Sequence, residues 1–144
     1  MYLLDTNIIS AAAPNRAPRT PIVQWMDAQS GRLHLSTISI AEIESGIAKA
    51  RRTGAKKRAD LIVQWLAQLL HLYGSRVLAF DVESARIAGA MIDATRAKGA
   101  PVGFPDIAIA ATAKCNGLVV LTQNLKHFQP LGVRAHDPFV SLPT

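Results

Sequence analysis

The sequence contains a single cysteine, Cys115, which excludes a disulfide framework and any cysteine-based metal site. We expect Cys115 to pack as a small buried hydrophobe in a helix. No apolar run approaches the roughly 18 residues that a membrane-spanning helix needs. The first residues also lack the basic flank and cleavage site of a signal peptide. Together these absences predict a soluble, cytoplasmic protein.

Acidic residues are fewer than basic ones, 10 against 16, so the formal net charge is +6 and the pI is near 10.0. This excess is typical of proteins with a polyanionic partner, but on composition alone it is equally typical of a basic protein without one. Aromatic residues make up 6% of the chain, and most of them are needed for the core. With 144 residues, 49% of them hydrophobic, the chain has ample material for one domain covering residues 1–144.

Strand-like and helix-like segments alternate along the chain. Residues 2–4 and 118–121 are short apolar runs of the kind found in buried strands, and residues 105–116 form a helix that is apolar almost all round. A proline-rich loop is expected at residues 11–21. The alternation predicts an α/β fold with a central, mainly parallel sheet flanked by helices.

Three acids, Asp5, Glu42 and Asp106, each lie at the start of a helix. Taken alone, each has a structural explanation. Asp5 can cap the helix that begins at Thr6, and Asp106 sits favourably in a first helical turn. Glu42 forms an S-x-x-E capping box with Ser39, which accounts for it completely.

A chain that alternates strand and helix gathers these helix starts at one edge of its sheet. Three converging carboxylates repel one another unless a cation joins them. Hard oxygen ligands, without cysteine or paired histidine, suit Mg²⁺ or Mn²⁺ better than zinc. The inferred chemistry is metal-assisted attack of water on a phosphodiester, with Asp5, Glu42 and Asp106 as metal ligands and catalytic residues.

Residues 49–58 place six cations in ten positions, interrupted by Thr53 and Gly54. We interpret this segment as the tip of a protruding helical hairpin whose second helix runs from about residue 55 to 72. Such a tip is usually a solvated turn, but it is also the most concentrated basic feature available for phosphates. The candidate RNA-binding residues at this tip are Arg51, Arg52, Lys56 and Lys57.

These features, in this order and spacing, resemble a PIN-domain ribonuclease, and specifically the VapC-type toxin of a VapBC toxin–antitoxin pair. Each motif is weak alone, but the ordered set spans essentially the whole chain and is highly specific. The matching motifs are Leu4-Asp5-Thr6-Asn7, residues 36–46 around Glu42, Gly99-Ala-Pro-Val-Gly103, Asp106 to Ala113, Leu121 to Phe128, Gly132-Val133 and Asp137-Pro-Phe139.

The resemblance implies Mg²⁺-dependent endonucleolytic cleavage of RNA by Asp5, Glu42 and Asp106, with Asn124 at the family's fourth site position. Family members often carry an acid in this last segment, where this chain has Asn124 and His127. Three acids suffice for one metal, and whether a second is held stays open. Thr6 and Thr122 are expected to orient the carboxylates or a bound water.

The resemblance also implies partners. Toxins of this type form homodimers, and an antitoxin holds them inactive by laying its C-terminal segment across the toxin near the acidic site.

Two alternatives from other classes stay open at this point. One is a non-catalytic PIN-like scaffold that binds RNA, favoured by the missing fourth acid and the basic tip. The other is a phosphatase of the haloacid dehalogenase type, which also begins with a strand and an aspartate. That class needs a second aspartate two residues after the first, where this chain has Asn7.

Overall fold

A parallel sheet of five strands organises the part of the chain that the structure, a computed structural model, describes, namely residues 1–14 and 21–144. The loop predicted for residues 11–21 falls largely on residues 15–20, outside the described residues. The spatial order of the strands is β3-β2-β1-β4-β5, with every neighbouring pair parallel. The strands are β1 (Tyr2–Leu4), β2 (Leu33–Ser36), β3 (Val77–Leu78), β4 (Val119–Leu121) and β5 (Ala135–His136).

The central strand β1 divides the core into two layers, because successive side chains of a strand point to opposite faces. Tyr2 and Leu4 pack in one buried cluster, and Leu3 packs in the other. All three residues are buried. A short run of apolar residues without alternation is therefore what this position in the sheet requires.

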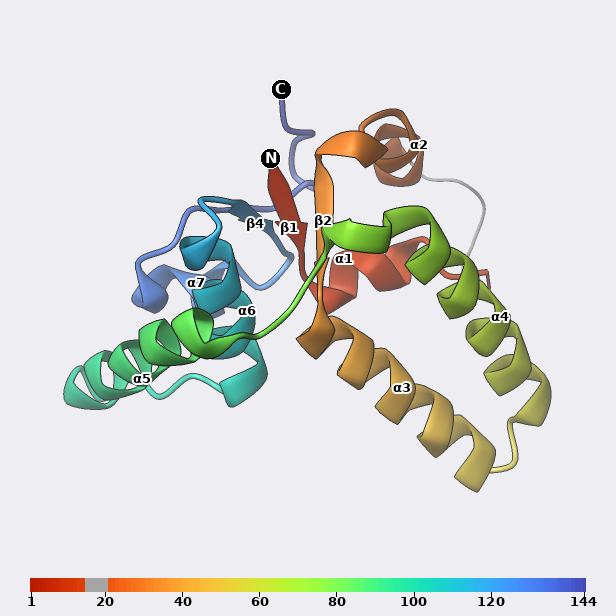
Figure 1. Cartoon of the computed structure of the whole chain (residues 1–144), viewed down its shortest axis with the longest axis horizontal. Coiled ribbons are helices and arrows are strands. Elements are labelled where there is room, and N and C mark those ends of the chain that lie inside the picture. Colours follow the sequence, from red (N-terminus) through yellow and green to blue (C-terminus); the bar gives the residue numbers. More distant parts are fainter. Residues whose placement is uncertain (15–20) are drawn as a thin grey trace.

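Helices cover both faces of the sheet (Figure 1). The first face carries α1 (Thr6–Ala11), α2 (Pro21–Ala28), α3 (Thr37–Arg52) and α4 (Lys56–Tyr73). The second face carries α5 (Val82–Ala97), α6 (Phe104–Cys115) and α7 (Leu125–Phe128). Short 3₁₀ turns occupy Ser30–Arg32, Gly74–Arg76 and Gln129–Leu131. The predicted α/β class with a parallel sheet is confirmed.

Helices α3 and α4 form the predicted hairpin, which extends away from the sheet in Figure 1. The turn between them needs Gly54, whose φ of 88° lies in a region that side chains with a Cβ rarely adopt. Because only one side of the hairpin meets the core, most of its charged residues are exposed.

Helix α6 passes through the interior, as its composition predicted, with every residue from Ile107 to Ala113 buried. The expectation for Cys115 was wrong, because this residue ends α6 and is exposed. The helix leaves the core at Lys114, one residue earlier, so its last turn meets solvent. No helix in the described part of the chain has the length and apolarity needed to cross a membrane.

Candidate active site at the carboxyl edge of the sheet

Three neighbouring strands end in polar residues at one edge of the sheet. Asp5 follows β1, Ser36 ends β2 and Thr122 follows β4, and all three residues are buried. Helix α6 leads back into β4, so its first turn, which holds Asp106, lies at this same edge. The sequence therefore places its acids where ligands bind in open parallel sheets.

Hydrogen bonds fix the carboxylate of Asp5 on both of its oxygens. The backbone N–H of Thr6 donates to Oδ1 at 2.8 Å. The hydroxyl of Thr122 donates to Oδ2 at 2.7 Å, and the Asn7 amide donates to the same oxygen at 3.0 Å. Asp5 thus does cap α1, but it is also only 4% exposed and is held by a residue 117 positions away in sequence.

Burial raises the pKa of the Asp5 carboxyl above its usual range. The hydrogen bonds from Thr122 and Thr6 lower this pKa and so offset part of the effect, whereas the negative charges of Asp106 and Glu42 raise it further. Both acids are therefore close enough to repel Asp5. Negative charge is therefore concentrated around Asp5, the most buried of the three acids.

Glu42 does not form the predicted capping box. The N-cap of α3 is Ser36, whose hydroxyl accepts from the backbone N–H of Ile38 at 3.0 Å. Since the helix begins three residues earlier than the box requires, Ser39 lies inside the helix and Glu42 lies in its second turn. The carboxylate of Glu42 instead accepts from the hydroxyl of Thr6 at 2.7 Å, which connects it to the residue after Asp5.

Asp106 contacts His127, with 2.8 Å between Oδ2 and the ring nitrogen Nδ1. The side chain of Asp106 is 23% exposed and that of His127 is 45% exposed. A cavity of about 280 Å³ opens beside them, lined also by Lys126. Asn124 precedes α7 and is exposed, and its backbone N–H donates to the hydroxyl of Thr122 at 2.9 Å.

Among residues 1–14 and 21–144, no group of three or more His, Cys, Asp or Glu side chains is close enough to form a ready-made metal cage. Asp5, Glu42 and Asp106 are nevertheless coupled, through the Thr6 hydroxyl and through mutual repulsion. The donor chemistry fits a hard divalent cation, because carboxylate and hydroxyl oxygens surround a buried acid that pairs with no cation among the residues that the structure describes.

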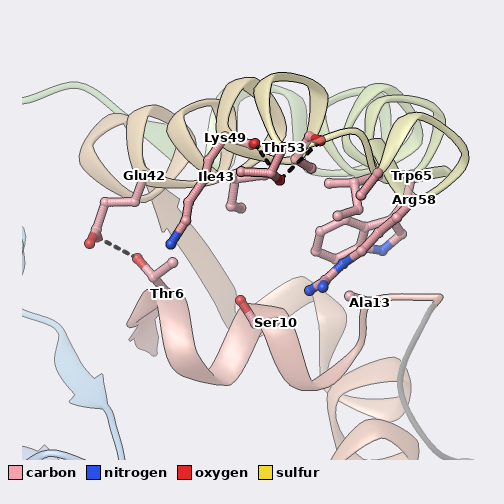
Figure 2. Close-up of a pocket in the computed structure, with 13 residues that line it drawn as sticks. Thr6, Ser10, Ala13, Glu42, Ile43, Lys49, Thr53, Arg58 and Trp65 are labelled. Atoms are coloured by element: carbon pink, nitrogen blue, oxygen red, sulfur yellow. Dashed lines mark hydrogen bonds between the residues drawn. The ribbon is translucent and has the colours of Figure 1, made fainter. Parts of the chain in front are cut away.

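A second cavity, of about 360 Å³, lies between α1 and the α3–α4 hairpin (Figure 2). Thr6 and Glu42, which belong to the acidic site, line one end of this cavity (Figure 2). Lys49 and Arg58 direct their charged groups into the same space. The four cations that the sequence singled out, Arg51, Arg52, Lys56 and Lys57, are not among the lining residues.

Comparison with known proteins assigns nearly the whole chain to the family that its sequence motifs resemble. The profile of the PIN domain matches residues 2–130. This chain belongs to the PIN domain family. The match sets aside the haloacid dehalogenase alternative, since the aspartate after the first strand is part of a different fold.

The chain is similar to several curated proteins. Plasmid stability protein StbB of Pseudomonas syringae pv. tomato is 36% identical over 141 residues, which cover 96% of this chain and 99% of StbB. VapC ribonuclease Y4jK of Sinorhizobium fredii is 32% identical over 143 residues, with 96% and 98% covered. Among solved structures, FitAcB from Neisseria gonorrhoeae superposes with a TM-score of 0.84 at 32% identity, covering 96% of this chain and 99% of that one.

Within this PIN domain, sequence reasoning missed two contacts of the acidic site. Asn7 was expected only to favour the start of the helix, but its side-chain amide also donates to the carboxylate of Asp5. The ring of His127, noted only as a departure from the family pattern, contacts Asp106. Spacing along one helix could have indicated a third feature, because Lys49 follows Glu42 by two helical turns and so lies on the same side of α3.

Proposed function

We propose that this PIN domain is an endoribonuclease toxin that cleaves RNA phosphodiester bonds with Mg²⁺ held by Asp5, Glu42 and Asp106. The observation that carries the proposal is the placement of Asp5, a buried carboxylate fixed by Thr122 and Asn7 and repelled by the two other acids. An arrangement that only capped α1 needs neither the burial nor the repulsion. Nucleases of this family are metal-dependent, and Mn²⁺ is expected to substitute for Mg²⁺.

The bound ion supplies the charge that activates water and stabilises the phosphate oxygens during hydrolysis. The protein's own contribution is positional. Thr122 and Asn7 direct Oδ2 of Asp5, and Thr6 orients Glu42 through its hydroxyl. These contacts hold the carboxylates before substrate arrives, so little reorganisation is needed during the reaction.

His127 and Asn124 take the place of a fourth acid in this proposal. The ring of His127 contacts Oδ2 of Asp106, so one of the two carboxylate oxygens is held by a ring nitrogen. Asn124 is exposed beside Thr122 and can offer its amide to the RNA or to a bound water. With three acids rather than four, one ion is the occupancy that we propose. We place the reaction in the cytoplasm, where the RNA substrate is found.

The test compares the unmodified protein with Asp106→Asn and Glu42→Gln in an RNA cleavage assay with Mg²⁺. Both variants should lose nearly all activity and remain folded, and chelation of the metal should abolish activity in the unmodified protein. Glu44→Gln is a matched control, because Glu44 is exposed on the same helix and outside both cavities. A second readout is the melting temperature, which Mg²⁺ should raise in the unmodified protein and not in Asp106→Asn.

An active Asp106→Asn protein would contradict the assignment of the site. The non-catalytic scaffold alternative predicts that RNA binding is retained, that no cleavage occurs with either Mg²⁺ or Mn²⁺, and that Glu42→Gln changes nothing.

We further propose that the toxin is controlled by an antitoxin of the VapB type and forms a homodimer. Solved neighbours of this chain are toxin–antitoxin complexes, some of them bound to DNA. Within the described part of the chain no lysine or arginine pairs with Asp5, Glu42 or Asp106, which suits a partner that supplies such a cation to the site. Such a partner would exclude RNA and metal at once.

A further inference from the structure

We propose that the cavity between α1 and the α3–α4 hairpin binds the backbone of single-stranded RNA through Lys49 and Arg58 and guides the strand to the acidic site. This inference rests on the proposed function and names the surface that receives its substrate. The cavity has about 360 Å³ of space and is partly open to solvent.

Three helices contribute to this cavity in the same way. The lining residues repeat at spacings of four and three, which place side chains on one side of a helix. The repeats are Thr6 and Ser10 on α1, Glu42, Gly46 and Lys49 on α3, and Arg58, Ile62 and Trp65 on α4, and Ala13 lies two residues beyond the end of α1. The cavity is thus a consequence of the sequence pattern and not of an accidental gap between elements.

The charges of the cavity are arranged in order along it. Glu42 lies at the end nearest the acidic site, and the backbone of Lys49 follows about 10 Å along the axis of α3, given 1.5 Å per residue, while its amine reaches back toward Thr6 (Figure 2). Arg58 enters from the first turn of α4 (Figure 2). An RNA strand in this cavity would have its phosphates beside the cations and would lead onward to the carboxylates.

Neither cation is engaged by an acid in the described part of the chain, whereas nearby Arg51 pairs with Asp60 at 3.1 Å. Lys49 and Arg58 are both exposed, so they can exchange water for a phosphate without breaking an internal contact. Gly46 lies between Glu42 and Lys49, and a Cβ placed there would meet nothing within 4 Å. The wall of the cavity is therefore open at the point that the strand must pass.

Trp65 adds an aromatic surface at the far end of the cavity. It is half-buried and packs its inner part against the core, which leaves an edge or face toward the cavity. Bases of single-stranded RNA stack on aromatic rings without strong sequence preference. Cations, an aromatic ring and hydroxyls are the combination that favours a nucleic acid strand over an apolar peptide.

The binding test uses a fluorescein-labelled uridine 12-mer with EDTA present, so that no cleavage occurs. Affinity is measured between 50 and 200 mM salt for the unmodified protein and for Lys49→Ala/Arg58→Ala. Loss of two phosphate contacts should reduce the slope of log affinity against log salt by about 1.4, at about 0.7 per contact with single strands. The variant should then lose about sevenfold less affinity over this salt range than the unmodified protein.

The charge-matched control is Lys98→Ala/Lys114→Ala, which removes two exposed cations, one that follows α5 and one in the last turn of α6, away from the hairpin. Its slope should equal that of the unmodified protein. Equal slopes for the pocket variant and the control would overturn the proposal. So would a result in which an antitoxin peptide occupies the cavity while the RNA slope is insensitive to Lys49 and Arg58.

Tryptophan fluorescence gives an independent readout. The chain has two tryptophans, and Trp25 packs its ring against Tyr2. Addition of the unlabelled 12-mer should quench the emission of the unmodified protein, and Trp65→Phe should remove most of this quenching. Undiminished quenching in Trp65→Phe would exclude the cavity as the binding site. Because these measurements need no catalysis, an active Asp106→Asn protein would refute the proposed function and leave this result standing.

Discussion

At the scale of single residues, Asp5 carries a conflict between burial and charge. Its carboxylate receives three hydrogen bonds, yet its pKa is raised because desolvation outweighs them and two further acids repel it. A group of this kind is costly for the folded state and useful for binding a cation. Removing the charge should therefore stabilise the protein and disable it at the same time.

The first prediction follows from this raised pKa. The folded protein binds the Asp5 proton more tightly than the unfolded chain, whose carboxyl titrates near 3.8. The free energy of unfolding contributed by Asp5 therefore falls as pH rises from 3.8 through the raised pKa. With EDTA present, Asp5→Asn should gain stability relative to the unmodified protein as pH increases over this window. Urea denaturation at a series of pH values measures the difference, and a difference that does not vary with pH would contradict the prediction.

The residue types at the acidic site could be recognised from sequence, because carboxylates at helix starts after apolar runs are a local pattern. The contacts between them could not. Thr122 is 117 positions from Asp5, and no local signal joins the two. The exposure of Cys115 could not be predicted from the sequence either, because it depends on where α6 leaves the core.

At the scale of elements, α3 joins the sheet to the site. Ser36 ends β2, pairs in register with Leu78 of β3 and caps α3. One residue therefore terminates a strand and begins a helix, which fixes the direction in which Glu42 points. Both Ser36 and Ser39 have suitable capping chemistry in the sequence. The choice between them is made by strand pairing, which a local pattern does not contain.

The second prediction tests this cap. Ser36→Ala removes the buried hydroxyl that accepts from the Ile38 N–H and leaves that partly buried donor without this partner. We expect the free energy of unfolding to fall by about 1 kcal/mol, within the range of roughly 0.5 to 2 kcal/mol for lost N-caps. Chemical denaturation measures the loss. Ser45→Ala serves as the control, because Ser45 is exposed inside the same helix and alanine is the better helix former there.

The hairpin shows what element-level patterns can and cannot predict. Its two helices and its glycine turn were indicated by the spacing of apolar residues and by Gly54. Which of its cations face the site was not, because that depends on how α1 packs across the hairpin. The prediction for Arg51, Arg52, Lys56 and Lys57 stays a prediction, and Lys49 and Arg58 join it from the structure.

At the scale of the whole molecule, the fold brings Asp5, Glu42 and Asp106 together at the sheet edge and places a cluster of cations at the tip of the hairpin that carries Glu42. The net charge of +6 attracts polyanions to the molecule as a whole. The acids alone would repel them. In the proposed function the cations of the hairpin offset this repulsion locally, so that RNA could approach the carboxylates once a metal is bound to them.

The third prediction concerns the partner. Co-expression with the small DNA-binding protein that we expect to be encoded beside this chain should relieve growth arrest. The purified complex should lack nuclease activity and regain it when the partner is proteolysed. Expression of Asp106→Asn alone is the control, since it should cause no arrest. If the unmodified chain is harmless on overexpression and captures no product of a neighbouring gene, the toxin assignment is wrong even where cleavage is seen in the test tube.

The order of the strands has a consequence for the timing of toxicity. Strand β1 is made first but lies in the centre of the sheet, and one of its two neighbours, β4, begins at Val119. Until that segment has been synthesised, Tyr2 and Leu3 lack one of their two pairing partners, and Asp5 lacks the hydrogen bond from Thr122. A ribosome that has translated the three acids has therefore not yet produced a nuclease. We expect the nascent chain to gain nuclease activity only after Thr122 has been synthesised and can donate to Asp5.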